Sequence, residues 1–168
     1  RIRSDKALYK LNHTFLILAA ALLALSSPLA ASKENTRLLN GAARQAARGD
    51  TLTALEVVER VLRQPGRDDS KPYALYLSGL FRAGRGQADS AEVSFQRLIA
   101  EYPASEFSGT SLAQLGSLLY RQGQDSLAVL VLEPLAVAFP DSSFTPTALI
   151  SMQRAADRAR LSQKAIRA

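Results

Sequence analysis

The chain repeats itself at a spacing of 37 residues. From Gly86 to Phe107 it reads GQADSAEVSFQRLIAEYPASEF, and from Gly123 to Phe144 it reads GQDSLAVLVLEPLAVAFPDSSF. The same shift aligns Gly49 with the two later glycines, which extends the pattern toward the N-terminus. A unit of this length cannot bury its own apolar face, whereas stacked copies can. The repeat therefore predicts an array of similar units packed one on the next.

Within each copy the apolar residues recur at helical spacing. Ala91, Phe95 and Leu98 lie at i, i+4 and i+7, which places them on one stripe of a helix. A further helix is predicted before each glycine, at about 73–83 and 111–121, so each unit is a helical hairpin closed by a proline. The repeated small, bulky and helix-ending positions are Gly79, Ala91, Phe95 and Pro103 in one unit and Gly116, Ala128, Leu132 and Pro140 in the next.

The column of small residues has a steric meaning. Where two helices cross closely, only glycine or alanine lets the backbones approach. Gly79 is therefore expected to face Ala91, and Gly116 to face Ala128. The bulky residue that follows, such as Phe95, is expected to fill the space beyond and to pack toward the neighbouring unit.

These columns resemble the tetratricopeptide repeat, a helical pair with a small residue in each helix, a large apolar residue on the second helix and a proline after it. The match covers residues 36 to about 166. The family period is 34, and the three extra residues are expected in the connectors PASEFS and PDSSFT. The resemblance implies an all-α, right-handed solenoid over 33–168, with repeats at about 36–71, 72–108 and 109–145 and a partial one at 146–168.

The tyrosine–proline ending and the longer connector resemble the tetratricopeptide domains of bacterial envelope proteins. Two such types are the Tol-Pal-associated periplasmic coordinator and the outer-membrane assembly lipoproteins. The chain departs from the lipoprotein type because it has no cysteine to carry a lipid. It departs from the coordinator because little sequence separates Ser32 from the first repeat, which leaves no room for an N-terminal coiled coil.

Residues 1–32 have the layout of a secretory signal peptide, with a hydrophobic helix at its centre. A basic start is followed by an apolar stretch from Phe15 to Leu25 and then by small residues. That stretch is 11 residues long, whereas a bilayer span needs about 20. We expect cleavage after Ser32, with cleavage after Ala31 as the alternative position, a mature chain beginning near Lys33, and a periplasmic or otherwise secreted location. A retained membrane anchor is the alternative.

Composition excludes several kinds of chemistry. The chain has no cysteine, and its one histidine, His13, falls in the predicted signal segment. Thiol catalysis, cysteine-ligated metal and a Ser-His-Asp triad are therefore excluded from the mature chain. Asp68 and Asp69 are the best candidates for a pair of catalytic carboxylates, but they lie in a stretch that we expect to be a solvated connector. No catalytic residue, metal ligand, cofactor or small-molecule substrate is predicted, and we expect a protein that is not an enzyme.

The charge distribution also argues against nucleic acid as the partner. The net charge is +6, but residues 1–32 supply half of it and the remainder is spread without a basic run. A nucleic-acid binder stays open as an alternative that predicts a cytoplasmic location and strongly salt-dependent binding.

A concave face lined by the first helix of each unit is where the resemblance implies that a protein or peptide partner binds. Tyrosine and arginine often anchor such interfaces. Tyr76 and Tyr120 either anchor a partner or pack between helices, and Arg82 and Arg121 either pair with acidic partner groups or stay solvated. The predicted partner-binding residues are Tyr73, Tyr76, Leu80, Arg82, Tyr120 and Arg121.

The sequence therefore predicts a non-catalytic interaction scaffold in the bacterial cell envelope. The alternative is an accessory repeat region of a larger envelope protein whose enzymatic or cell-wall-binding domain lies beyond residue 168. A fourth unit is expected to begin at about Pro146, with Leu149, Met152 and Ala156 on one helix face.

Overall fold

The computed structural model describes residues 28–66, 68–138 and 145–166. Most of the predicted signal segment, and Pro140 with the connector that follows it, lie outside the described residues. None of the described helices is both long and apolar enough to cross a membrane. The described part contains seven helices and no strand: α2 (Pro28–Ala47), α3 (Thr51–Arg63), α4 (Lys71–Gly84), α5 (Ala88–Glu101), α6 (Glu106–Arg121), α7 (Asp125–Ala138) and α8 (Thr145–Ile166).

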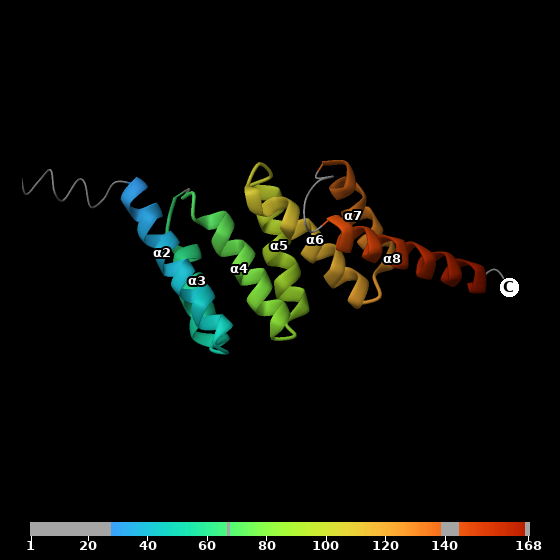
Figure 1. Cartoon of the computed structure of the whole chain (residues 1–168), viewed down its shortest axis with the longest axis horizontal. Helices are drawn as coiled ribbons and strands as arrows, with labels where there is room; N and C mark the ends of the chain where they lie inside the picture. The colour runs from blue at the N-terminus through green and yellow to red at the C-terminus, as the bar shows by residue number, and fades with distance from the viewer. Residues whose placement is uncertain (1–27, 67, 139–144, 167–168) are drawn as a thin grey trace, which may run out of the picture.

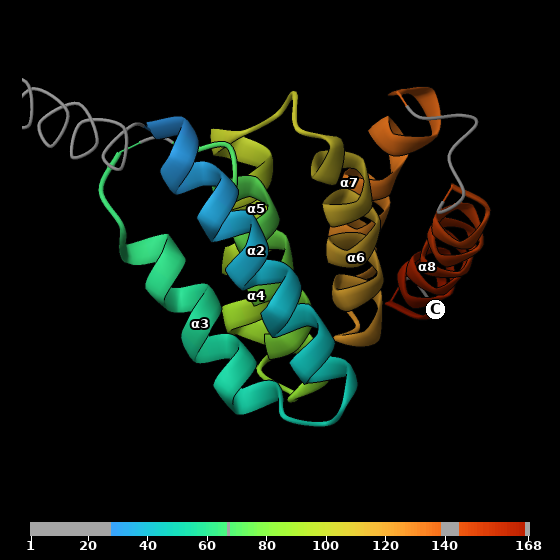
Figure 2. The ribbon, with the colours of Figure 1, turned by 60° about the vertical axis from the view of Figure 1, so that its left-hand side comes forward.

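The helices stand side by side in chain order along the long axis of the molecule (Figure 1). Successive helices pair as the hairpins α2–α3, α4–α5 and α6–α7, with α2 and α3 nearest the viewer in Figure 2. The first helices α2, α4, α6 and α8 contact one another in turn, whereas in the described part α3, α5 and α7 contact only first helices. The first helices therefore form one continuous face, here called the inner face. This is the predicted all-α solenoid of tetratricopeptide type.

The three aligned glycines make the same turn between the helices of each hairpin. Gly86 has φ of 74°, a left-handed conformation that glycine adopts without a Cβ penalty. Its N–H donates to the Ala83 carbonyl at 3.1 Å, and the Gln87 N–H donates to the Arg82 carbonyl at 2.9 Å. This pair of bonds satisfies the last free carbonyls of α4. The same two bonds recur at Gly49 and at Gly123.

The three extra residues of the repeat lie in a helix and not in a connector, so that expectation is wrong for α6. This helix begins at Glu106, five residues before the predicted start. Ser105 caps it by accepting a hydrogen bond from the Phe107 N–H at 3.2 Å, and Glu106 places a negative charge in the first turn, where the helix dipole favours it. The longer helix carries Phe107 onto the inner face.

The glycines in the middle of α4 and α6 are covered by the bulky residue of the next helix. A Cβ added at Gly79 would lie 2.4 Å from Cε1 of Phe95, and one added at Gly116 would lie 2.3 Å from Cγ of Leu132. Ala91 was expected in that place, but the side chain resting on Gly79 comes from one helical turn further along. Phe95 and Leu132 are each 1% exposed. The glycine thus makes room for a side chain in the core.

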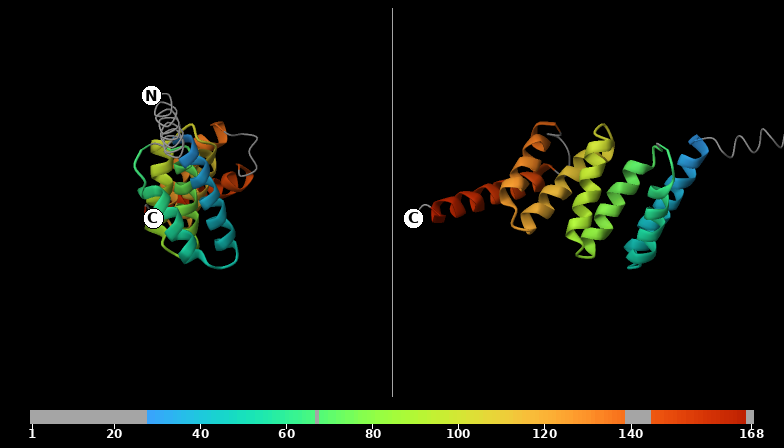
Figure 3. Two further views of the ribbon diagram at one scale, coloured as in Figure 1. Left: turned by 90° about the vertical axis from the view of Figure 1, so that its left-hand side faces the viewer. Right: turned by 180° about the vertical axis from the view of Figure 1, so that it is seen from behind.

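Helix α8 uses a different face from the one predicted. Ala148 and Ala155 are buried and Met152 is partly buried, whereas Leu149 and Ile150 are 39% and 54% exposed. At the 37-residue shift, Ala148 aligns with two other fully buried small residues. Small side chains at this position let each first helix approach the preceding hairpin. The far end of α8 extends away from the stack (Figure 3).

Candidate functional site

Three aromatic rings stack across the junction of α4 and α6. The ring centroid of Phe107 lies 5.0 Å from that of Tyr73 and 5.5 Å from that of Tyr76, with the planes inclined by 21° and 25°. Burial raises the pKa of both tyrosines. We call Tyr73, Tyr76 and Phe107 the aromatic stack. It joins two successive repeats on the inner face.

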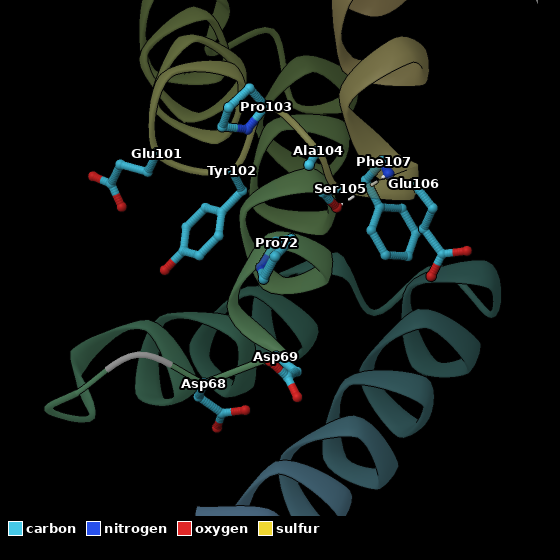
Figure 4. Close-up of a pocket in the computed structure, with 10 residues that line it drawn as sticks. All are labelled: Asp68, Asp69, Pro72, Glu101, Tyr102, Pro103, Ala104, Ser105, Glu106 and Phe107. Carbon is cyan, nitrogen blue, oxygen red and sulfur yellow. Dashed lines mark hydrogen bonds between the residues drawn. The ribbon is translucent and has the colours of Figure 1, made fainter.

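A pocket of about 630 Å³ opens beside the aromatic stack, between the α3–α4 and α5–α6 connectors. In Figure 4 the Tyr102 and Phe107 side chains lie on one side of this pocket, and Asp68 and Asp69 lie on the facing connector. We call it the connector pocket. Its described lining residues are Asp68, Asp69, Pro72, Glu101, Tyr102, Pro103, Ala104, Ser105, Glu106 and Phe107.

A second pocket, of about 370 Å³, lies on the inner face itself. It shares Asp69, Glu106 and Phe107 with the connector pocket, so these three side chains form a common wall. Its other sides are formed by residues of α2 and by residues at and just before the start of α4. We call it the groove pocket, because it lies in the groove between these two helices. Its described lining residues are Thr36, Asn40, Asp69, Ser70, Tyr73, Glu106 and Phe107.

A third pocket, of about 430 Å³, lies between α2 and α4 toward the opposite ends of these helices. Its lining is almost wholly apolar, so we call it the apolar pocket. The groove between α2 and α4 therefore runs from an acidic and aromatic end to an apolar end. The described lining residues of the apolar pocket are Ala43, Ala46, Ala47, Thr51, Leu77, Leu80, Phe81 and Gly84.

Hydrogen bonds hold Asp68 in its charged form at the rim of the connector pocket. Partial burial acts to raise the pKa of Asp68, but hydrogen bonds outweigh it and leave the pKa below its ordinary value. The Ser70 N–H donates to this carboxylate at 2.9 Å, and the Asn35 side-chain amide donates at 2.6 Å. Asn35 also bonds Gln64 at 2.6 Å. This network ties α2 to the α3–α4 connector and so fixes one side of the pocket.

The other carboxylates of the connector pocket differ in their partners. Glu101 accepts a hydrogen bond from Nε of Arg97 at 2.6 Å. Within the described part of the chain, the side chains of Asp69 and Glu106 make no hydrogen bond or ion pair. The nearby Lys71 ammonium is buried and donates to the Gln64 and Gly66 carbonyls. Asp69 and Glu106 are therefore the two carboxylates shared by the adjoining pockets that have no described hydrogen-bond or ion-pair partner, while Asp68 is held by neutral donors alone.

The structure brings three of the predicted partner-binding residues to this groove. Tyr73 lines the groove pocket, Leu80 lines the apolar pocket, and Tyr76 lies between them in the aromatic stack. The ring contact of Tyr76 with Phe107 is packing between helices, which is one of the two roles left open for it.

The other predicted residues lie elsewhere and have different partners. Arg82 donates to Glu59 of α3 at 2.7 Å, so its partner is within the molecule. The Arg158 guanidinium of α8 sits 4.2 Å from the ring centroid of Tyr120, which again is packing between helices. Arg121 is exposed at the last residue of α6.

Phe107, Glu106 and Asp69 were not predicted as site residues. The one sequence signal for this site is that Phe107 aligns with Phe144 at the 37-residue shift. That alignment does not indicate which face of the stack the side chain lies on. The site depends on two connectors that lie side by side only in the folded stack. A sequence pattern within one unit carries no information on that contact.

The chemistry of the site is that of a binding surface. It offers aromatic faces, carboxylates and an apolar pocket along one groove. Within the described residues, no group of three or more histidine, aspartate or glutamate side chains is placed to hold a metal ion.

Comparison with known proteins agrees with this architecture. A tetratricopeptide repeat family model matches residues 73–105, which span the α4–α5 hairpin. No curated protein gives a significant match. Two similar solved structures are "MamA 41-end from Desulfovibrio magneticus RS-1", at 25% identity and a TM-score of 0.63, and "MamA RS-1 ArsTM double mutant", at 23% identity and 0.64. Each match covers 79% of this chain and 70% of the other. The chain is thus an all-α solenoid of tetratricopeptide type, and the repeat recognised in it is the hairpin that supplies Tyr73 and Tyr76 to the site.

Proposed function

We propose that this chain is a non-catalytic protein-interaction scaffold of the bacterial cell envelope, which holds a segment of a partner protein on its inner face. The observation that carries the proposal is the groove between α2 and α4. It has a pocket at each end and the aromatic stack beside it, all on the face formed by the first helices. Helical-repeat solenoids use their extended concave surfaces for binding.

The envelope location is supported by the sequence. The basic start, short apolar stretch and small residues of 1–32 have the order of a signal peptide. The resemblance of the repeats to the Tol-Pal-associated coordinator and to the assembly lipoproteins supports the same compartment. A processed chain that begins near Lys33 keeps every α2 residue that lines the groove.

Site-specific photo-cross-linking tests the proposal. The complete gene is expressed with an affinity tag in a Gram-negative host, and a photoreactive phenylalanine analogue replaces Asn40, which is exposed and lines the groove pocket. The matched control carries the same analogue at Val93, which is 61% exposed on α5, away from the groove. Cells are irradiated and fractionated, and the covalent adducts are identified by mass spectrometry.

We expect adducts with an envelope protein from position 40 and none from position 93. Adducts of equal yield from both positions would contradict binding on the inner face. Recovery of an unprocessed chain in the cytosol would contradict the envelope location and favour a cytoplasmic adaptor or a nucleic-acid binder.

A further inference from the structure

The two ends of the α2–α4 groove differ in charge as well as in polarity. The connector and groove pockets share the carboxylates of Asp69 and Glu106 as a wall, and no described lining residue of either pocket is basic. The apolar pocket at the other end has no charged lining residue among those described. A partner segment that fills the whole groove must therefore present two different kinds of side chain.

The acidic end stands out because the chain as a whole is basic. The net charge is +6, yet the wall between the two pockets carries two carboxylates without a described partner. Two nearby basic groups have other partners, since Lys71 donates to backbone carbonyls and Arg97 to Glu101. Arg44 of α2 acts on the pKa of Tyr73 but is not among the described lining residues of either pocket. The charge of this wall is therefore complementary to a cation brought by a partner.

Two other features of the acidic end suit a lysine or arginine side chain. Tyr102 and Phe107 present aromatic rings at the pocket, and such rings attract an ammonium or guanidinium group. Ser70, which also lines the groove pocket, is 2% exposed, and its hydroxyl makes no hydrogen bond of normal geometry. That hydroxyl lies close enough to Asp68 to help lower the pKa of that carboxyl, so it belongs to the same polar end of the groove.

The length of α4 sets the spacing between the two kinds of side chain. Tyr73 lines the groove pocket and Leu80 lines the apolar pocket, seven residues apart on one helix. At a rise of about 1.5 Å per residue they are roughly 10 Å apart along the axis, and Asp69 lies about one turn further. An extended chain covers this distance in about three to five residues.

We infer that the groove binds an extended segment of a partner protein that carries a lysine or arginine about three to five residues from a large apolar side chain. The basic side chain enters the wall of Asp69 and Glu106, and the apolar side chain enters the pocket lined by Leu80. This inference rests on the proposed function and adds to it the chemistry of the partner.

A defined peptide tests the inference on the full chain. The probe is a fluorescein-labelled peptide with two adjacent arginines at its centre and a leucine four positions away on either side, in a glycine–serine background, so that it fits in either direction. Binding is measured by fluorescence anisotropy in 150 mM salt. Two further peptides replace the arginines by glutamates or the leucines by serines.

Two double variants distinguish an effect of the wall carboxylates on probe binding from a general effect of net charge. Asp69→Asn with Glu106→Gln removes the two wall charges, and Glu56→Gln with Glu133→Gln removes two exposed carboxylates on α3 and α7. We expect the wall variant to bind the probe about tenfold more weakly, as the loss of charge-assisted hydrogen bonds implies, and the control to stay within about twofold of the native chain. We expect no binding of the glutamate peptide and about tenfold weaker binding of the serine peptide. Circular dichroism melting confirms that both variants are folded.

Equal weakening in the wall variant and the control would overturn the inference, because it would show a general charge effect. Absence of probe binding at millimolar protein would overturn it as well. The same wall variant is carried into the cross-linking experiment. If adducts from position 40 persist in it, the basic-segment inference fails while the scaffold proposal stands. If adducts are absent from position 40 in the native chain while the probe binds, the scaffold proposal fails on its own.

Discussion

At the scale of single residues, two glycines of the described helices are closely covered by a neighbouring side chain. The ring of Phe95 rests on Gly79, and the side chain of Leu132 rests on Gly116, in contacts that leave no room for a Cβ. Both covering side chains are almost completely buried, so neither can move aside without disturbing the core. Each glycine therefore fixes how closely one helix lies against the next.

Gly79→Ala and Gly116→Ala are each expected to destabilise the fold. The added methyl group overlaps a buried side chain, and overpacking of this kind costs about 1 to 3 kcal/mol. Urea denaturation followed by circular dichroism measures the change in the free energy of unfolding. Gly41→Ala is the matched control, because Gly41 lies inside α2 with no atom near its Cβ position, and alanine there favours the helix. Equal stability of all three variants would show that the contacts over the two glycines are loose.

Asp50 is a residue whose charge stabilises a helix start. Its carboxylate caps α3 by accepting a hydrogen bond from the Thr53 N–H at 3.2 Å, and this bond, with a smaller contribution from Gln45, lowers the pKa of Asp50. A lowered pKa in the folded state means that the charge stabilises the fold above the ordinary aspartate pKa of about 4. That stabilisation is lost as the pH falls through the lower, folded-state pKa.

We therefore expect Asp50→Ala to lower the melting temperature at pH 7 and to differ less from the native chain at about pH 2.5. Thermal melts at several pH values measure the difference. A gap that stays constant down to the lowest pH would contradict a role for the carboxylate charge.

At the scale of helices, the sequence predicted the helical hairpins more reliably than it predicted the first residue of each helix. The prediction of helical hairpins is confirmed, because apolar spacing and turn glycines act within one unit. The start of α6 was placed five residues late, since the serine cap and the acidic first turn were read as a connector. The buried face of α8 was also wrong by one position. Alanine was the contacting residue there, and hydrophobicity alone favours the larger Leu149.

Pro134 is an unfavourable residue within an otherwise regular helix. It lies inside α7 and is exposed, and at the 37-residue shift its counterparts are Arg97 and Arg60. A proline in a helix interior lacks the N–H donor and clashes with the preceding turn, at a cost of about 3 kcal/mol relative to alanine.

Pro134→Arg is expected to stabilise the chain by about 1 to 3 kcal/mol, as a better helix former at an exposed position. The change is measured as a higher urea midpoint. Glu133→Ala, at the neighbouring exposed position, serves as the control and should shift the free energy of unfolding by less than about 0.5 kcal/mol. A lower midpoint for Pro134→Arg would indicate that the packing of α7 against α8 needs the bend that proline imposes.

At the scale of the whole molecule, each helix contacts only near neighbours in the chain. Helix α4 contacts α2, α3, α5 and α6, whereas α8 contacts α6 and α7 alone among the described helices. In such a stack, stability is close to a sum of units and their interfaces, and the ends open first.

Hydrogen exchange is therefore expected to be slowest in α4 and α5 and fastest in α2 and α8. Mass spectrometry of peptic fragments from the native chain measures this order. One common exchange rate for all helices would show instead that the stack unfolds only as a whole.

The candidate site is formed by residues from several repeats that come together only in the folded stack. The sequence therefore predicted only some of its residues. Tyr73, Tyr76 and Leu80 were predicted from their place on a first helix, and all three lie along the groove. The acidic wall was missed because Asp69 lies in the α3–α4 connector and Glu106 in the first turn of α6, which belong to different repeats. Arg82 was predicted as a partner contact, but Glu59 on the preceding helix lies within hydrogen-bond distance of it.

The aromatic stack also gives the protein an optical signal of its own. The sequence has no tryptophan and five tyrosines, of which Tyr73 and Tyr76 stack on Phe107 and Tyr102 lines the connector pocket. Absorption and emission between 270 and 310 nm therefore come from tyrosine, and three of its five rings surround one junction. Near-ultraviolet circular dichroism should report directly on the angle between α4 and α6. In a Phe107→Trp variant, tryptophan fluorescence would report on whether a partner segment is bound at that junction.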